Sequence, residues 1–306
     1  MIMKKEFLEM MEKAKANGKK IMTVACPHQD SAIIAAKRAS DEGIVDPILI
    51  GDIDKINKIA EENNITLNGI TIIDCKNEEE ACDKSVEMVA NGEADFIMKG
   101  LIDTSVILKS YLKSKYQMRT EKLISHVAVF NPESYDKMIF VTDASMNIAP
   151  TLDQKRQIVD NAVDVARKMG VEMPKVAAVA AIEKVNPKMK ETVEARELQL
   201  MNEKGIIKNA VVAGPLALDN AMMAKAAKIK SIDHPVAGHA DILILPNIEI
   251  GNILYKTFAF CSHSNHAGVI VGGKTPIVLT SRSDGEDAKY NSIVLAKFLL
   301  EAGGDH

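Results

Sequence analysis

Apolar positions recur with two different periods along this chain. Residues 20–26 and 70–75 are short apolar runs rich in β-branched side chains, which is typical of buried strands. Residues 31–42 and 53–62 carry apolar side chains at three- and four-residue spacing, which predicts helices with one buried face. The same patterns predict strands at 47–51 and 94–99 and helices at 78–90 and 104–115. Strands that alternate with helices indicate βαβ units and a mostly parallel sheet.

This rhythm breaks near the middle of the chain. Residues 125–130 and 137–143 are two strand-like runs separated by the turn Asn131-Pro132-Glu133-Ser134. Two strands joined by so short a turn favour an antiparallel hairpin. We expect the boundary between two domains at this break.

The alternation of strands and helices resumes after the hairpin. Residues 153–169 form the clearest amphipathic helix, and Gly170 is a typical signal for its end. Further strands are predicted at 175–182, 210–213, 240–245, 268–271 and 277–280, and further helices at 187–203, 216–229 and 288–302. The chain is therefore predicted to be an α/β protein with mostly parallel sheets.

Length and composition are those of an ordinary globular protein. The 306 residues suit about two domains or one large α/β unit. The net charge of −4 argues against a nucleic-acid scaffold, which normally carries a basic patch. No apolar run approaches the ~20 residues needed to cross a bilayer, and residues 1–6 lack the apolar stretch of a secretory signal. The four cysteines show no CxxC pairing and suggest reduced thiols. We expect a cytoplasmic protein with neither membrane nor nucleic acid as a partner.

Candidate chemistry lies near the carboxyl end of the chain. An apolar run at 275–280 leads into Ser281-Arg282 and the polar turn Ser283-Asp284-Gly285-Glu286-Asp287. Ligands of open α/β sheets bind at the carboxyl ends of strands, arginine suits bidentate recognition of phosphate, and a nearby carboxylate can accept a proton. The turn therefore predicts a phosphate-binding site with acid–base chemistry. The alternative is a helix start capped by Ser283 or Asp284, with an acidic first turn that complements the helix dipole.

A second phosphate-binding motif matches in its sequence pattern but not in its predicted structural context. Residues 268–275 match the P-loop pattern GxxxxGK[ST]. A P-loop must follow a strand and open a helix, whereas Val-Ile-Val here is strand-like, and Pro276 and another apolar run follow. We therefore predict no nucleoside-triphosphate site, although Lys274 could still contribute charge near a phosphate.

The histidines do not predict a metal site. His234 and His239 lie five residues apart, a spacing at which neither a helix nor a strand makes them converge. His263 and His266 could share one helical turn, but no HExxH-like general base accompanies them. We interpret these side chains as solvated or as anchors of loops.

Three further motifs carry a resemblance to a known family. Residues 235–247 read Pro-Val-Ala-Gly-His-Ala-Asp-Ile-Leu-Ile-Leu-Pro-Asn, residues 251–256 read Gly-Asn-Ile-Leu-Tyr-Lys, and Ser281-Arg282 follow them. In this order they resemble the phosphotransacylases, the phosphate acetyltransferases and phosphate butyryltransferases. Residues 98–104 and 214–221 add to the resemblance, which spans nearly the whole chain.

The resemblance implies a fold and a domain division. Phosphotransacylases have two α/β domains with an interdomain cleft, an architecture shared with the isocitrate and isopropylmalate dehydrogenases. By this likeness, residues 1–121 and 270–306 form the first domain, and residues 122–269 form an inserted second domain.

The resemblance also implies an activity and site residues. Phosphotransacylases interconvert acyl-CoA plus phosphate with acyl phosphate plus CoA, by direct transfer in a ternary complex. Arg282 would bind the phosphoryl group, Ser281 would hydrogen-bond developing negative charge, and Asp287 would be the base, with Glu286 and Asp284 as alternatives. Residues expected to bind substrate are Lys99, Lys109, Asn252, Lys256 and Glu286.

Within this family the chain is more similar to the butyryl branch, in length and in the sequence of residues 214–219. The acetyl branch usually has a glycine after the Ser-Arg pair, whereas Ser283 stands here. The resemblance implies acyl-CoA and inorganic phosphate as partners, coenzyme A as a substrate with no tightly bound cofactor, and a homodimer or higher homo-oligomer. A phosphate acetyltransferase, an NAD-dependent dehydrogenase on the same fold and a non-catalytic binding module are the alternatives.

Overall fold

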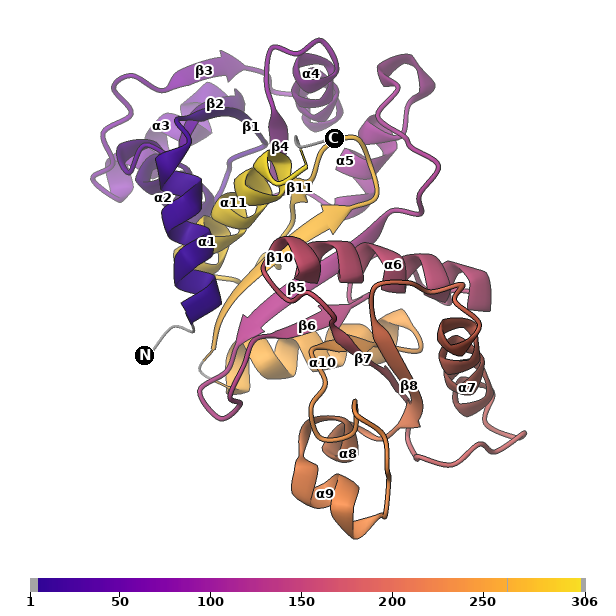
Figure 1. Cartoon of the computed structure of the whole chain (residues 1–306). Helices are drawn as coiled ribbons and strands as arrows, with labels where there is room; N and C mark the ends of the chain where they lie inside the picture. Colours follow the sequence, from indigo (N-terminus) through magenta and orange to yellow (C-terminus); the bar gives the residue numbers. More distant parts are fainter. Residues whose placement is uncertain (1–4, 263, 304–306) are drawn as a thin grey trace. The chain divides into compact units, whose positions relative to one another are not determined.

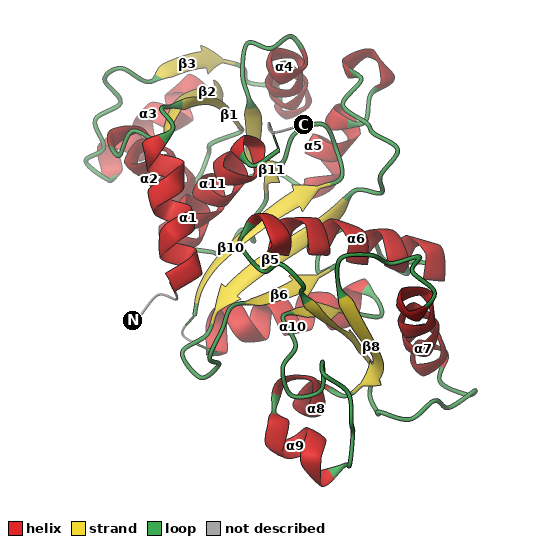
Figure 2. Cartoon of the chain, in the orientation of Figure 1, coloured by secondary structure: helices red, strands yellow, loops and turns green. Residues whose placement is uncertain are grey.

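The computed structural model describes residues 5–262 and 264–303. Contacts between Cα atoms divide these residues into two compact units. The first unit contains residues 8–122 and those from 266 onward, and the second contains residues 123–265 with the few described residues up to Phe7. Each unit contains strands with helices packed on them (Figures 1 and 2).

The part of the sheet that lies in the first unit is mostly parallel. Its strands lie in the order β3-β2-β1-β4-β11-β10. Strands β1, β2, β3, β4 and β11 pair in parallel, and β10 pairs with β11 in the antiparallel direction. The strands are β1 (Lys20–Ala25), β2 (Val45–Gly51), β3 (Thr71–Asp74), β4 (Phe96–Lys99), β10 (Asn265–Val271) and β11 (Ile277–Val278).

Helices cover this sheet, and local sequence fixes where several of them begin. Asp52 caps α3 by accepting hydrogen bonds from the amides of Asp54 and Lys55, and Asn77 caps α4 in the same way. The last helix, α11, is buried along most of its length and packs against α2 (Figure 1). The helices are α1 (Lys5–Ala16), α2 (Asp30–Asp41), α3 (Ile53–Glu62), α4 (Glu78–Ala90), α5 (Thr104–Tyr111), the 3-10 turn η1 (Ser114–Tyr116) and α11 (Glu286–Glu301).

In the second unit the strands lie in the order β5-β6-β9-β7-β8. Strands β5 and β6 form the predicted antiparallel hairpin, and the remaining pairs are parallel. The strands are β5 (Ser125–Asn131), β6 (Ile139–Thr142), β7 (Lys175–Val179), β8 (Val211–Leu216) and β9 (Ile242–Ile244). The helices are α6 (Leu152–Lys168), α7 (Lys190–Glu203), α8 (Leu218–Met222), α9 (Ala224–Ile229) and α10 (Ile248–Cys261).

The core of the second unit explains why α10 lies on this sheet. Tyr255 of α10 is buried and meets the ring of Phe130 of β5 edge-on, with 5.4 Å between ring centroids. Gly251 allows the helix to approach the backbone, because a Cβ atom there would lie 2.2 Å from the carbonyl oxygen of Asp143. Aromatic packing and this close approach fix the helix on the hairpin strands.

The α/β fold with mostly parallel strands is confirmed, and most elements lie where the sequence predicts them. Residues 268–275 are the end of β10 and a turn into the antiparallel strand β11, so they do not have the context of a P-loop. The helix predicted at 216–229 is two helices, because Met223 between them has extended backbone angles. Helices α1 and α10 were not predicted.

Candidate active site

The carboxyl ends of neighbouring strands bring the predicted phosphate-binding residues to one edge of the first sheet. Strand β4 pairs in parallel with β1 on one side and β11 on the other. Lys99 is the last residue of β4, and Ser281 and Arg282 follow β11. Because parallel strands end at the same edge, these three residues meet where ligands of α/β sheets bind.

Lys99 is buried at this edge, with only 5% of its surface exposed. Its Nζ donates hydrogen bonds to the carbonyl oxygens of Gly100 at 3.2 Å and Ile102 at 2.9 Å. Burial, together with the positive charges of Arg282 and Lys289, lowers the pKa of the Lys99 ammonium to about 8. A buried cation beside two other cations is an unfavourable arrangement that a bound anion would relieve.

Arg282 extends from the same edge into solvent. Its side chain is 64% exposed and its Nη2 lies 3.4 Å from Oδ1 of Asp103, so this ion pair is weak. The backbone is held more firmly, because Nε2 of Gln29 donates a hydrogen bond of 2.8 Å to the carbonyl oxygen of Arg282. The guanidinium is therefore anchored at its base and available to an incoming ligand.

The turn after Arg282 is organised by a buried carboxylate. Asp284 is 3% exposed, and its Oδ2 accepts a hydrogen bond of 2.7 Å from the backbone amide of Ser281. The amide of Asp284 donates in return to the carbonyl oxygen of Ser281 at 3.1 Å. The hydroxyls of Ser281 and Ser283 lie 2.9 Å apart. The turn thus fixes the backbone from which the Ser281 hydroxyl projects.

The capping interpretation of this turn is wrong. The residue at the N-cap position of α11 is Gly285, which has no side chain to cap the helix, so neither Ser283 nor Asp284 is the cap residue. The Asp284 carboxylate bonds the amide of Ser281 instead. An acidic first turn is present, with Glu286 and Asp287.

Two further groups surround Asp284, and the sequence did not single either of them out for this position. Nε2 of His266, on β10, lies 3.5 Å from Oδ1 of Asp284. Nζ of Lys289, one turn into α11, donates to the carbonyl oxygen of Asp284 at 2.5 Å. Burial lowers the pKa of Lys289, although the charge of Asp284 opposes this effect. Asp284, His266 and Lys289 form a buried polar cluster next to Ser281.

The other residues predicted on this unit contact groups outside the cluster. Oδ1 of Asp287 pairs with Nη1 of Arg38 at 2.9 Å, and the Asp287 side chain is 77% exposed. Lys109, on α5, lies 3.6 Å from Glu79 and is also exposed. Glu286 is exposed on the first turn of α11. The assignment of Asp287, Glu286 and Lys109 to the site stays a prediction.

Asn252 and Lys256 belong to the second unit, on α10. Nδ2 of Asn252 donates to the carbonyl oxygen of Ala144 at 3.4 Å, and Lys256, one turn later, is exposed. Both side chains therefore lie on the same stretch of helix, four residues apart. Their role in binding a substrate also stays a prediction.

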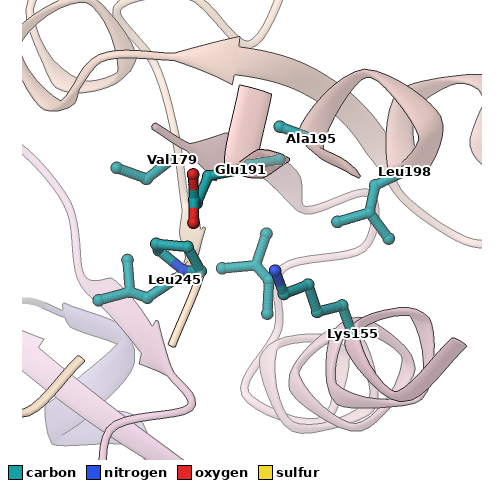
Figure 3. A pocket seen from close by; sticks show the side chains of 9 residues that line it. Lys155, Val179, Glu191, Ala195, Leu198 and Leu245 are labelled. Carbon is teal, nitrogen blue, oxygen red and sulfur yellow. The ribbon is translucent and has the colours of Figure 1, made fainter. Parts of the chain in front are cut away.

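The second unit contains a small pocket that the sequence did not indicate (Figure 3). It lies beside the carboxyl ends of β7 and β9. At its side, Nζ of the buried Lys155 pairs with Oε2 of Glu194 at 2.6 Å. The lining is mainly aliphatic, with Ala178, Val179, Ala195, Leu198, Ile244, Leu245 and Pro246 beside Lys155 and Glu191. Because Lys155 already has a carboxylate partner, the pocket offers an apolar surface and no open anion site.

Neither a metal cluster nor a membrane span was found where the structure describes the chain. Within residues 5–262 and 264–303, no group of three or more His, Cys, Asp or Glu side chains could hold a metal ion. His266 belongs to a strand, while His263 lies outside the described residues. Over the same residues, no helix has the length and apolar character needed to span a membrane.

Comparison with known proteins gives matches along nearly the entire chain. The family model described as phosphate acetyl/butaryl transferase matches residues 6–85 and 78–297. The phosphate acetyltransferase of Thermotoga maritima is 46% identical over 291 residues, which are 95% of this chain and 98% of that protein. The phosphate butyryltransferase of Clostridium acetobutylicum is 44% identical over 292 residues, which are 95% of this chain and 97% of that protein.

A solved structure supports the same grouping. The crystal structure of a branched-chain phosphotransacylase from Enterococcus faecalis superimposes with a TM-score of 0.80 at 35% sequence identity. The superposition covers 92% of this chain and 99% of that protein. The residues that the family model matches extend over both units and include Lys99 and the Ser281-Arg282 pair.

Proposed function

Because this chain belongs to the phosphate acetyl/butyryl transferase family, we propose that it transfers a short-chain acyl group, preferably butyryl, between coenzyme A and inorganic phosphate. The observation that carries the proposal is the position of Ser281 and Arg282 beside the buried Lys99 at one sheet edge, in a chain that the family matches nearly end to end. The protein is on this proposal an acyltransferase that uses coenzyme A as a substrate.

The proposed reaction is a direct transfer with no acyl-enzyme. In one direction a phosphate oxygen attacks the thioester carbonyl carbon, and the carbon–sulfur bond breaks to release CoA. In the other direction the CoA thiol attacks the carbonyl carbon of the acyl phosphate, and inorganic phosphate leaves. A thiol has an ordinary pKa near 8.5, so its attack at neutral pH needs a group that accepts its proton.

We assign the phosphoryl group to Lys99 and Arg282. The two cations approach each other closely enough for Arg282 to lower the pKa of Lys99, and this repulsion favours binding of an anion between them. Arg282 supplies a planar fork, whereas Lys99 supplies a point charge from a buried position. The hydroxyl of Ser281 is proposed to donate to the carbonyl or phosphate oxygen as negative charge develops.

Two carboxylates of the turn are proposed to have different roles. Asp287 is exposed, which suits a group that exchanges protons with a substrate, and we propose it as the base. Asp284 is buried against the Ser281 amide and is better suited to hold the turn in place. Glu286, exposed beside Asp287, is the alternative base.

The remaining predicted residues are proposed to bind the rest of the substrates. Lys256 presents an exposed ammonium on α10, which suits the phosphates of coenzyme A. Asn252 lies one turn before it and offers an amide for hydrogen bonding. Lys109 is exposed on α5 and its ion pair with Glu79 is long, so its charge is available to a second phosphate group.

We also propose that residues 1–121 with 270–306 and residues 122–269 are separate domains. The division of contacts between residues 122 and 123 and between residues 265 and 266 supports this proposal. Expression of residues 122–269 alone should give a segment that unfolds cooperatively. A segment without a thermal transition would count against an independent domain.

A cytoplasmic homo-oligomer completes the proposal. Cys26, Cys75, Cys82 and Cys261 are free thiols, which suits a reducing compartment. Helix α10 exposes three large apolar side chains, Ile250, Ile253 and Phe260, at 45%, 65% and 51%. Their spacing of three and seven residues places them on one helix face, which suits contact with a second copy.

The oligomer can be tested by light scattering on a size-exclusion column. Ile253→Asp should reduce the mass to that of one chain, because a charge on this face opposes burial. Ile229→Asp, at a side chain that is 74% exposed on α9, is the matched control and should leave the mass unchanged. A single-chain mass for the parent protein would overturn the oligomer.

The activity is tested by following release of free thiol from butyryl-CoA. Release should require inorganic phosphate and should not depend on added NAD. Thiol release without phosphate would indicate a hydrolase, reduction of NAD would indicate a dehydrogenase, and binding of acyl-CoA without turnover would indicate a binding module. Any of these three results would overturn the proposed function.

A further inference from the structure

A guanidinium on α2 contacts the proposed base on α11. Nη1 of Arg38 donates a hydrogen bond of 2.9 Å to Oδ1 of Asp287, across 249 positions of the chain. The Asp287 side chain is 77% exposed, and a carboxylate in water moves between rotamers unless a partner holds it. The contact with Arg38 therefore determines where this carboxylate lies.

Arg38 is itself held by contacts on other sides. Its Nε donates to Oε1 of Glu42 at 3.0 Å. The carbon at the centre of its guanidinium lies 3.8 Å from the centroid of the Tyr290 ring, and Tyr290 is fully buried. A planar guanidinium that stacks on a fixed ring and bonds a carboxylate through a second nitrogen keeps little freedom to move. Arg38 is thus in place before Asp287 pairs with it.

Glu42 is the anion that fixes this arrangement. Its Oε2 accepts a hydrogen bond of 2.6 Å from the hydroxyl of Tyr290 and pairs with Nζ of Lys15, on α1, at 2.5 Å. Burial raises the pKa of the Glu42 carboxyl, but the hydrogen bonds from Lys15, Tyr290 and Arg38 outweigh burial and lower the pKa to about 2. Glu42 therefore stays ionised near neutral pH and keeps its hold on Arg38.

Helix α2 also holds the other end of the turn. Gln29 is the residue before the first turn of α2, and its side chain does not cap the helix. Its Nε2 donates instead to the carbonyl oxygen of Arg282 at 2.8 Å. One helix thus contacts the turn at the proposed phosphate ligand, Arg282, and at the proposed base, Asp287.

We propose that Arg38 is a positioning residue for acyl transfer, which holds Oδ1 of Asp287 and leaves Oδ2 to accept the proton of the CoA thiol. No hydrogen bond from the described residues reaches Oδ2. In this step the proton moves from sulfur to Oδ2, and the sulfur electron pair forms the bond to the acyl carbon. The bond from that carbon to the phosphate oxygen breaks, and inorganic phosphate leaves with its electron pair. Arg38 gives up no proton, because a guanidinium stays charged in proteins. The inference rests on the proposed function and on Asp287 as the base.

The alternative role of the pair is only to fasten α2 to α11. Loss of an exposed ion pair of that kind would lower the Tm slightly and leave the rate of the chemical step unchanged. Loss of a positioning contact should instead lower kcat for thiol attack by roughly 10- to 100-fold, because a small displacement of a reacting group has an effect of this size. The KM for butyryl phosphate should change little, since on this proposal Arg38 contacts neither substrate.

The neighbouring residue on α2 offers a close control. Nζ of Lys37 pairs with Oδ1 of Asp41 at 2.5 Å, in the same four-residue spacing as Arg38 and Glu42. Lys37→Met therefore removes a cation and an ion pair from the same helix, one position away, without removing a contact to the turn. It should keep the kcat and KM of the parent protein.

The experiment measures the attack of CoA on butyryl phosphate by the parent protein, Arg38→Met, Asp287→Asn and the double variant. Arg38→Met should lower kcat by roughly 10- to 100-fold, and by no more than Asp287→Asn does. In the double variant, Arg38→Met should cause no loss beyond that of Asp287→Asn, because a positioning residue acts only through the group that it holds. A Tm for each variant shows that it is folded.

A second variant keeps the test open if Arg38→Met does not fold. The amide of Arg38→Gln can still donate to Glu42 but is too short to reach Asp287 as well, so it should show the same loss and the same absence of a further loss beside Asp287→Asn.

Four results would overturn the inference. A kcat equal to that of the parent, with or without a lower Tm, would leave Arg38 as a fastening between helices. An equal loss from Arg38→Met in the parent and beside Asp287→Asn would show that it acts independently of that carboxylate. An equal loss in Lys37→Met would assign the effect to α2 in general, and full activity of Asp287→Asn would remove the base that Arg38 is proposed to hold. The proposed function fails separately, if the parent protein itself transfers no acyl group in either direction.

Discussion

The buried carboxylate of Asp284 accepts a hydrogen bond from the backbone amide of Ser281, with 2.7 Å between the two atoms. This contact closes the turn that carries Ser281 and Arg282 and determines where both side chains begin. It also distinguishes Asp284 from Asp287, two carboxylates that the sequence presents as near equivalents. Asp284 is buried in the turn, whereas Asp287 pairs with Arg38 on the outside of the unit. The following predictions use that difference.

Asp284→Asn should lower both stability and turnover. The substitution keeps an oxygen for the Ser281 amide but removes the negative charge from a site that is 3% exposed and lies near His266 and Lys289. Lys289 then lacks a buried counter-charge, which is a costly arrangement. We expect a lower Tm and a loss of turnover of about tenfold or more in both directions, measured by thermal unfolding and by the thiol-release assay. An unchanged Tm would show that the Asp284 charge does not hold the turn.

Asp287→Asn should lower the rate of transfer but leave the Tm nearly unchanged. Its carboxylate is exposed and pairs with Arg38 at the surface, so its loss should change the Tm little. If Asp287 accepts the thiol proton, the rate should fall when CoA attacks acyl phosphate, and the acidic limb of the pH–rate profile should flatten. Glu286→Gln is the control one residue away. A larger loss for Glu286→Gln would move the base to Glu286.

Arg282→Lys should reduce turnover by ~10²–10³, the range for loss of an electrostatic contact made in the transition state. Lysine keeps the charge but cannot form the planar fork that binds phosphate bidentately. Arg156→Lys is a matched control, because Arg156 forms surface ion pairs with Asp153 and Asp160 on α6. Turnover of Arg282→Lys within twofold of the parent would remove Arg282 from the site.

The charge of Lys99 should make phosphate binding depend on pH. Burial and the neighbouring cations lower its pKa to about 8, so the side chain is positive below that pH and becomes neutral as the pH rises through it. We expect the KM for phosphate to rise above pH ~8 in the parent protein. Lys99→Met should raise that KM by about tenfold or more at neutral pH and remove its dependence on this titration.

Lys109→Met is the control for Lys99→Met, since Lys109 is exposed and its pair with Glu79 is long. The parent and Lys109→Met should share one pH profile for the phosphate KM. A Lys99→Met protein with the parent profile would show that another group controls phosphate binding.

The fold could be predicted from the sequence because apolar residues recur with a clear period in most helices and strands. The helices predicted at 53–62 and 78–90 have the bounds Ile53–Glu62 and Glu78–Ala90 in the structure. Helix α10 was missed because Ile248–Cys261 carries apolar residues on several faces, many of them β-branched or aromatic, and contains Gly251. Its position depends on contacts distant in sequence, above all the packing of Tyr255 on Phe130.

Part of the candidate site could be predicted from the sequence for a similar reason. Lys99 and Arg282 each follow an apolar run, and parallel strands bring such positions to one edge. The role of Asp284 could not be predicted from the sequence. An aspartate after a strand can cap a helix or accept a hydrogen bond within a turn, and which of the two occurs depends on burial. The contribution of His266 depends on the antiparallel pairing of β10 with β11, which local sequence does not specify.

The last prediction is that kcat/KM for butyryl-CoA exceeds that for acetyl-CoA. The motivation is the likeness of residues 214–219 and of Ser283-Asp284 to the butyryl branch. Each methylene buried from water contributes about 0.8 kcal/mol, so two additional methylenes in a fitted pocket favour butyryl by roughly tenfold or more. Acetyl-CoA should still react slowly, since a smaller group is disfavoured only by the contacts it lacks, whereas longer chains should be excluded more sharply by steric overlap. A series of acyl-CoA substrates from acetyl to hexanoyl, assayed with the same phosphate concentration, measures this preference. A value for acetyl-CoA equal to or above that for butyryl-CoA would contradict the assignment to the butyryl branch and leave the phosphotransacylase activity itself in place.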